Sequence, residues 1–428
     1  PSRISLCDID VDFGKEDRDW IKNYIFNMDG VYTSEIITFN TIADLGAIRD
    51  VGRALDIPLE EVDYICKNFA DNEESLRKQY KELFEYVDII KGTVVSIGTH
   101  PSGIVVSPIP LDGDVGLMTL PTTSNPVSQL NMKSLDSANY VKLDVLGLDN
   151  IKVINETCKL VGIDRLNPDS IDYYDDKVFD SIIYDTTTIF QMESNVATGC
   201  LRQIFSEKSL NNIREKYGKI DKFNLLDFIN GCIRPSGDSF RNNAINGICG
   251  NTGLKELDEM LFDTLGYVLT QEQIMEFLNK FCGYSMSESD SVRRAIGKKM
   301  DTTQFIDDIK SRFLEYSIPK FNLDEEQAKS IIEDFIQVII SANRYGFSRN
   351  HSFAYTSISV ACAWLRYYYP LEYLTSCFNT WSDDQDKTDR ITKYTLKRNI
   401  TINNPIFRKS KGEYFFDKDT NSIYKGIG

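Results

Sequence analysis

A short run near the amino terminus places three acidic residues two positions apart in an apolar segment, Cys7-Asp8-Ile9-Asp10-Val11-Asp12-Phe13. In a β-strand, alternate side chains point to the same face, so these carboxylates would share one side, roughly 6 to 7 Å apart. Like charges that close resist ionising together unless a cation lies between them. Hard oxygen ligands favour Mg²⁺ or Mn²⁺ over zinc, and a pair of such ions suits phosphoryl transfer. The alternative is an amphipathic strand with a solvated acidic edge.

Composition limits the class of protein. With 428 residues, 42% of them hydrophobic, the chain can form roughly three domains. It contains no apolar run of about 18 residues and no signal-peptide pattern, which predicts a cytoplasmic protein that does not enter a membrane. Its nine cysteines are odd in number and lack C-x-x-C spacing, which predicts reduced, mostly buried thiols and no zinc site.

The charge balance excludes a protein that coats nucleic acid by bulk electrostatics. The formal net charge is -16, whereas non-specific binding depends on lysines and arginines that neutralise phosphates. Basic residues nevertheless gather in three segments, 293–299, 344–351 and 393–411. Any contact with nucleic acid is therefore expected to be local.

A second segment adds another carboxylate. Lys142 and Asp144 alternate with apolar residues in the stretch 140–148, so a strand there would put both on one face. One interpretation is a buried ion pair. The other makes Asp144 a further metal ligand and lets Lys142 reach a phosphate.

The hydrophobic pattern predicts strands around two helical regions. Apolar spacing of three and four residues predicts helices over 17–27 and 41 to about 90, with Pro58 opening one of them, and over most of 150–380. A glycine-rich turn is predicted at 98–102, between two strands. The remaining predicted elements are strands at 35–39, 93–97, 103–107, 140–146, 413–416 and 422–424 and a helix at 386–397.

Taken in order, the motifs resemble those of the C family of bacterial replicative polymerases, the DNA polymerase III alpha subunits, over nearly the whole chain. Each motif alone is weak evidence, and their shared order and approximate spacing carry the resemblance. The motifs are the acidic run at 7–13, Thr38–Thr41, Ile48–Arg53, Gly98–Gly103, Lys142–Leu148, Ile189–Ser194, Arg234-Pro235, Gln271–Met275, Arg293–Lys299 and Tyr345–His351.

The resemblance implies an α+β fold with a nucleotidyltransferase-type, polymerase beta-like palm sheet, a helical thumb insertion and a large, mostly helical fingers domain. The implied domains are a first palm part at 1–40, the thumb at 41–92, a second palm part at 93–150, the fingers at 151–380 and a strand-containing C-terminal part of the fingers at 381–428.

The resemblance also implies the chemistry. Asp8, Asp10 and Asp144 would be the catalytic aspartates, holding two Mg²⁺ ions, or Mn²⁺, for DNA-directed DNA synthesis. A basic helix would bind the triphosphate, although a solvated basic face is the alternative. Its residues are Arg293, Arg294, Lys298 and Lys299.

Contacts with primer-template DNA are expected from residues inside the other motifs. For His100 and His351, a purely structural role is the alternative. The aromatic residues at 364 and 367–369 are expected to pack in the core rather than to stack on bases. The expected DNA-binding residues are Lys142, His100, Arg49, Arg53, Arg349 and His351.

The chain also departs from the family pattern. The PHP domain and the glycine- and serine-rich loop that the family places before the acidic strand are not present, nor are the clamp-binding segments that follow in the family. We expect either a piece of a longer enzyme or a split-gene product, of bacterial or phage origin, whose partner chain completes the palm. Its other partners would be deoxynucleoside triphosphates and a sliding clamp. A non-catalytic DNA-binding or replisome scaffold, and a metal-dependent nuclease, are the alternative functions.

Overall fold

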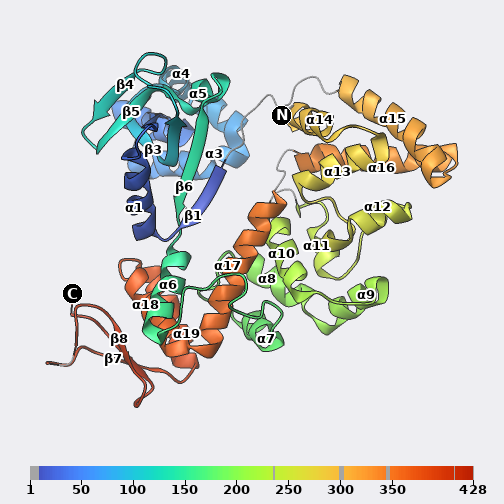
Figure 1. Ribbon diagram of the computed structural model, residues 1–428. Coiled ribbons are helices and arrows are strands. Elements are labelled where there is room, and N and C mark those ends of the chain that lie inside the picture. Colours follow the sequence, from blue (N-terminus) through green and yellow to red (C-terminus); the bar gives the residue numbers. More distant parts are fainter. Residues whose placement is uncertain (1–8, 235–236, 298–302, 344–347, 409, 428) are drawn as a thin grey trace. The chain divides into compact units, whose positions relative to one another are not determined.

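The structure is a computed structural model that describes residues 9–234, 237–297, 303–343, 348–408 and 410–427 (Figure 1). The chain divides between Leu148 and Asp149 into two compact units, here called the sheet unit and the helical unit. The predicted mixture of α and β structure is confirmed. Among the helices described, none combines the length and apolar character needed to cross a bilayer.

The sheet unit is built on six strands in the order β1-β6-β3-β2-β5-β4. Strand β1 runs parallel to β6 and β2 runs parallel to β5, while the other neighbours are antiparallel. The strands are β1 (Ile9–Phe13), β2 (Tyr32–Thr41), β3 (Val94–Ser107), β4 (Leu117–Leu120), β5 (Thr123–Asn131) and β6 (Val141–Gly147). The helices are α1 (Lys15–Phe26), α2 (Asp44–Ala54), α3 (Leu59–Gln79), α4 (Lys81–Ile90) and α5 (Met132–Ser137).

Helix α1 covers one face of the sheet. A Cβ added to Gly147 would lie 3.1 Å from the Arg18 side chain of α1. Lys22 of α1 also reaches Glu35 of β2, at 3.5 Å. The odd-numbered residues of β6, including Val145 and Gly147, point to one face of the strand. Helix α1 therefore packs on this face. The even-numbered residues of β6, and the residues of β1 that pair with them, point to the opposite face.

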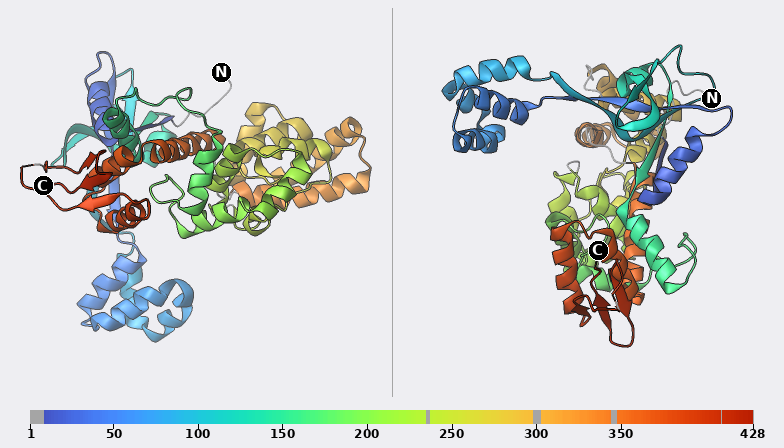
Figure 2. Two further views of the ribbon diagram at one scale, coloured as in Figure 1. Left: turned by 90° about the horizontal axis from the view of Figure 1, so that it is seen from below. Right: turned by 90° about the vertical axis from the view of Figure 1, so that its left-hand side faces the viewer.

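Strands β2 and β3 extend beyond the sheet as a two-stranded ribbon with a helical group at its end (Figure 2). Ile37–Thr41 pairs with residues 94–99 in this ribbon. Helices α2, α3 and α4 form their own apolar core around Ile48, Ile65 and Val87, all fully buried. The helices predicted between 41 and 90 are therefore present, and Pro58 lies immediately before α3 as expected.

The helical unit contains fourteen described α-helices and a small sheet of three strands in the order β7-β9-β8. Its first helices are α6 (Asp149–Val161), α7 (Asp176–Tyr184), α8 (Asn195–Ile204), α9 (Glu207–Tyr217), α10 (Lys222–Cys232), α11 (Arg241–Ile245), α12 (Lys255–Met260) and the 3₁₀ turn η2 (Phe262–Thr264). Next come α13 (Gln271–Cys282), α14 (Met286–Gly297), α15 (Thr303–Phe321), α16 (Glu325–Asn343), α17 (Arg349–Tyr368), α18 (Pro370–Thr380) and α19 (Gln385–Lys397). The strands are β7 (Thr401–Asn403), β8 (Phe415–Asp417) and β9 (Ser422–Tyr424).

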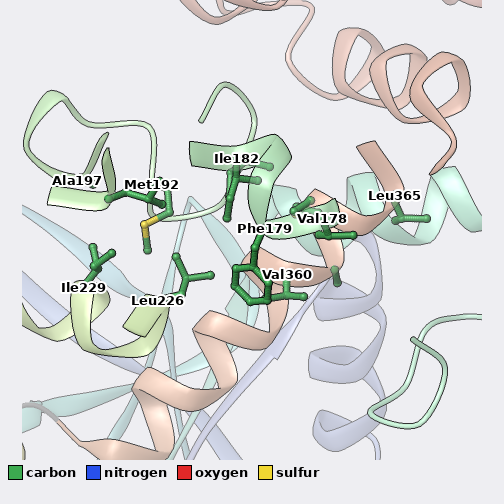
Figure 3. Packing of buried hydrophobic residues seen from close by; sticks show 14 of the residues in the cluster. Val178, Phe179, Ile182, Met192, Ala197, Leu226, Ile229, Val360 and Leu365 are labelled. Atoms are coloured by element: carbon green, nitrogen blue, oxygen red, sulfur yellow. The ribbon is translucent and has the colours of Figure 1, made fainter. Parts of the chain in front are cut away.

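Two apolar cores hold the helical unit together. The larger one joins α6, α7, α8 and α10 to α17 and α18, with Phe179, Leu226 and Val360 among its buried members (Figure 3). The second joins α12 to α16, with Phe277 and Phe313 fully buried. Trp364, Tyr367 and Tyr369 pack against the larger core, as predicted, whereas Tyr368 is 43% exposed, so the core position expected for it is wrong. The eight described cysteines are free, and seven of them are buried, as predicted.

One local prediction is wrong. The segment 98–102 is not a turn between two strands, because β3 continues through it and both halves pair with β2. A β-bulge accommodates the extra residues: Glu35 pairs with Ile104, whereas Ile37 pairs with Thr99. Strands β4, β5 and β7 were not predicted.

The helical group at the end of the ribbon gives the first testable prediction. Ile65→Ala removes a fully buried side chain, so the free energy of opening of α2–α4 should fall by about 2 to 5 kcal/mol. Native-state hydrogen exchange of these helices measures it. Leu59→Ala, at a side chain that is 74% exposed, is the control and should change little. Equal effects of both substitutions would contradict the core assigned here.

Candidate functional site

Two of the predicted aspartates lie side by side. Asp10 of β1 pairs with Asp144 of β6 in the register of two parallel strands. Paired residues of neighbouring strands point to the same face, so both carboxylates lie on the face opposite α1. Asp8 lies outside the described residues. Because β1 is the edge strand of the sheet, Asp10 is exposed, whereas Asp144 is only 7% exposed.

The buried carboxylate of Asp144 is held from two sides. The Lys142 ammonium lies 2.7 Å from Asp144 Oδ2, and the Ser102 hydroxyl donates a hydrogen bond of 3.1 Å to Asp144 Oδ1. Lys142 comes from the same strand two residues away, while Ser102 comes from the bulge of β3. A buried charge needs such partners, since desolvation penalises it strongly. The ion pair and the shared strand face expected for these residues are therefore both present.

His100 lies beside Asp144 but does not hydrogen-bond to it. Its Nδ1 is 3.9 Å from Asp144 Oδ1 and instead accepts from the backbone N–H groups of Gly103, at 2.7 Å, and of Ser102, at 3.3 Å. Burial lowers the pKa of His100, the Asp144 carboxylate opposes that shift, and the Lys142 cation adds to it. Because Nδ1 accepts these backbone N–H groups, a neutral ring carries its proton on Nε2.

Gly103 leaves the space that this arrangement needs. A Cβ at this position would lie 2.9 Å from His100 Nδ1 and 3.0 Å from Asp144 Oδ1. Both distances are too short for a carbon atom without movement of its neighbours. The glycine thus allows β3 to approach β6 closely, where it pairs directly with Asp144.

The donor atoms are of the kind that a hard divalent cation prefers. Asp10 and Asp144 offer carboxylate oxygens, and the nearby His100 Nδ1 is already occupied by backbone donors. Oxygen-only coordination favours Mg²⁺ or Mn²⁺ over zinc. Within the described ranges no group of three or more histidine, cysteine, aspartate and glutamate residues could hold a metal ion. The described residues therefore supply two carboxylates of the predicted three.

The predicted basic helix is α14. Arg293 and Arg294 both contact Asp290, at 2.8 Å and 3.2 Å, and Arg293 also donates to Gln271 Oε1 at 2.8 Å. Lys298 and Lys299 lie outside the described residues. The Asp290 carboxylate orients both guanidinium groups, so this part of the helix is an ordered ion-pair cluster rather than a set of mobile charges.

A second basic residue reaches the same turn of α13. At the start of α17, the backbone N–H of Arg349 donates to Glu272 at 3.0 Å, and the Arg349 side chain pairs with Asp263. Since Arg293 contacts Gln271, the first turn of α13 brings together cationic residues from α14 and α17. His351 packs on the ring of Tyr355, with 3.9 Å between ring centroids.

Arg49 and Arg53 lie elsewhere in the sheet unit. Both are exposed on α2 in the helical group at the end of the ribbon, four residues apart and therefore on one side of the helix. The Arg53 guanidinium is 3.9 Å from Asp50. The structure does not bring these arginines together with Asp10 and Asp144.

A cavity of about 460 Å³ lies in the helical unit, between α16 and the segment 239–268. Its wall includes Phe240 and Tyr267, whose rings stack 4.6 Å apart, together with Phe335. None of its lining residues is a candidate site residue from the sequence analysis.

Sequence reasoning missed three residues that organise these sites. Ser102 lies inside a predicted motif but was not selected, although a hydroxyl two residues from a histidine in a glycine-rich segment was a usable signal. Glu272 and Asp290 gave no local signal of their partners, because their contacts come from packed helices.

Comparison with known proteins assigns the class. Residues 1–147 match the family described as the bacterial DNA polymerase III alpha NTPase domain, and residues 239–318 match the bacterial DNA polymerase III alpha subunit finger domain. The first match covers nearly all of the sheet unit and the second covers part of the helical unit, and together they span just over half of the chain. The chain therefore belongs to the bacterial DNA polymerase III alpha family.

Curated relatives match along the whole chain. It is 28% identical to the DNA polymerase III subunit alpha of Ureaplasma parvum, over 100% of this chain and 44% of that protein. It is also 28% identical to the protein of that name from Caulobacter vibrioides, over 100% of this chain and 38% of the relative. The Bacillus subtilis protein of that name is 28% identical over 96% and 37%, respectively. The chain thus spans less than half the length of these relatives.

The space beside Asp144 gives a second prediction. Gly103→Ala should lower the melting temperature, because overpacking between His100 and Asp144 costs about 1 to 3 kcal/mol. Gly113→Ala is the matched control in the same unit, since a Cβ there meets nothing within 4 Å. Differential scanning calorimetry compares the two variants. Equal melting temperatures for Gly103→Ala and the unmodified chain would contradict the close approach of β3 to β6.

Proposed function

We propose that this chain is the catalytic portion of a replicative DNA polymerase, which transfers deoxynucleotidyl groups from triphosphates to a primer 3′-hydroxyl under the direction of a template. The observation that carries the proposal is the pairing of Asp10 with Asp144 on adjacent parallel strands. Membership of the DNA polymerase III alpha family supports the same reaction. The reaction is a phosphoryl transfer, for which paired carboxylates are the expected ligands of divalent cations.

Asp10 and Asp144 would hold the cations, with Asp8 as the third ligand predicted from sequence. A Mg²⁺ or Mn²⁺ ion bound there would make the primer hydroxyl more acidic and would neutralise charge on the triphosphate. Lys142 and Ser102 hold the Asp144 carboxylate in a fixed orientation. Lys142 becomes available to a phosphate only when it leaves this ion pair.

The two units take different parts in the proposed reaction. The mixed sheet of the sheet unit would be a nucleotidyltransferase-type palm, and α2–α4 would be a thumb that grips duplex DNA, with Arg49 and Arg53 on its exposed surface. The helical unit would be the fingers. Arg293 and Arg294 of α14 would bind the triphosphate, and Arg349 of α17 would bind the template backbone.

The proposed partners follow from the family. They are primer-template DNA, deoxynucleoside triphosphates, a further segment or partner chain that completes the palm, and a sliding clamp. The proposed place of action is the cytoplasm, where bacterial or phage DNA is replicated. Base pairing would select the nucleotide, while the protein contacts backbone and shape.

Primer extension tests the proposal. Asp10→Asn and Asp144→Asn should each abolish extension by the full chain supplied with its completing segment, because each removes a charged ligand. Asp114→Asn makes the same chemical change at an exposed loop position and should leave extension unchanged. Extension of a labelled primer in Mg²⁺ is measured on a denaturing gel. Undiminished extension by the Asp10→Asn or the Asp144→Asn variant would refute the assignment.

A second function, a non-catalytic DNA-binding or replisome scaffold, is favoured by one observation. Lys142 already neutralises Asp144, as in a purely structural ion pair. The same experiment separates the two functions: a scaffold binds primer-template DNA in an anisotropy assay but extends no primer, with or without the substitutions.

The role proposed for α14 gives a further prediction. Arg294→Ala should raise the KM for the deoxynucleoside triphosphate about tenfold or more, since a charge-assisted contact contributes roughly 1.5 to 3 kcal/mol. Lys255→Ala, which removes an exposed cation of α12, is the control. Steady-state incorporation of a single nucleotide measures both. A changed kcat with an unchanged KM would assign Arg294 to a different step.

A further inference from the structure

The bulge in β3 places a hydroxyl group against one carboxylate oxygen of Asp144. Four residues of β3, from His100 to Gly103, lie opposite the single residue of β2 between Glu35 and Ile37. This extra length moves Ser102 out of the regular ladder and toward β6. Ser102 is only 8% exposed, and its hydroxyl lies 3.1 Å from Asp144 Oδ1.

We propose that His100 and Ser102 are positioning residues for Asp144, in which the His100 ring fixes the bulge and the Ser102 hydroxyl fixes the carboxylate. This inference rests on the proposed function, because it concerns the carboxylate that would hold a cation. It gives His100 a role different from the DNA contact expected from the sequence.

The hydrogen-bond donors and acceptors around His100 support these separate roles for the ring and the hydroxyl. Nδ1 of a neutral imidazole has a single lone pair, and two backbone N–H groups already point at it. The Ser102 hydroxyl is 3.4 Å from the same nitrogen but has one proton to donate. Its distance to Asp144 Oδ1 is shorter, at 3.1 Å, so the proton goes to the carboxylate oxygen. The His100 ring therefore accepts from the backbone of the bulge, and the Ser102 hydroxyl donates to Asp144.

The surroundings leave little freedom for another arrangement. Lys142 occupies Asp144 Oδ2 at 2.7 Å, so Ser102 and Lys142 hold different oxygens of one carboxylate. Gly103 is the residue that lets the bulge close over Asp144, because a side chain there would collide with both His100 and Asp144. Outer partners of this kind typically change metal affinity 10- to 100-fold when removed.

Binding of Mn²⁺ alone to the full chain, followed by electron paramagnetic resonance of free Mn²⁺, tests the inference. Ser102→Ala should weaken Mn²⁺ binding about tenfold or more. His100→Ala should weaken it similarly, and His100→Asn should recover most of the loss, because the asparagine Oδ1 can accept the same backbone N–H groups. Ser96→Ala, which removes another hydroxyl of β3 that pairs with Asn40, is the control and should bind Mn²⁺ normally.

Two results would overturn the inference. One is Mn²⁺ binding by Ser102→Ala equal to that of the unmodified chain. The other is an equal loss in His100→Asn and His100→Ala, which would assign the ring a direct contact of its own.

A second measurement keeps the inference testable if the unmodified chain binds no Mn²⁺, a result that would count against the proposed function itself. Hydrogen exchange of the Gly103 amide should then be slow in the unmodified chain and in His100→Asn but fast in His100→Ala. Equal protection of this amide in all three proteins would overturn the inference independently of metal binding.

Discussion

The parallel pairing of β1 with β6 is the constraint on which the candidate site depends. These strands are far apart in the sequence, and their register places Asp10 against Asp144. A shift of one residue would move all β1 side chains to the other face, so that Ile9 or Val11 would replace the carboxylate. Helix α1 lies on the opposite face, where it approaches Gly147 of β6 and pairs with Glu35 of β2.

The bulge in β3 adds the remaining polar contacts around Asp144. The bulge of β3 brings Ser102 to Asp144, and His100 holds that bulge through backbone donors. The helical unit uses a similar principle, because Gln271 of α13 accepts from the Arg293 side chain and Asp263 pairs with the Arg349 side chain. In both units, charged groups are held by polar neighbours rather than left mobile, which lowers the entropy lost when a ligand binds.

Sequence patterns were reliable where periodicity and local chemistry agree. Helix α3 begins after Pro58 as predicted, and β9 has its predicted limits of 422–424. The segment 98–102 was misread because glycine, proline and serine occur both in turns and in bulges. Strand β5 was missed because Pro126 and its polar neighbours weaken the alternating pattern. The sequence analysis named Asp10 and Asp144 as candidate metal ligands and Lys142 and His100 as candidate DNA contacts, whereas it did not select Ser102.

The sequence by itself determined the chemical groups: alternating carboxylates on a strand, a lysine two residues from an aspartate, and the ordered motifs of a polymerase family. These are properties of spacing along a single segment, which strand and helix geometry converts directly into faces. Only the tertiary structure decided which segments meet. The register of β1 against β6 and the approach of Ser102 to Asp144 depend on contacts between residues far apart in the chain, which local spacing does not encode.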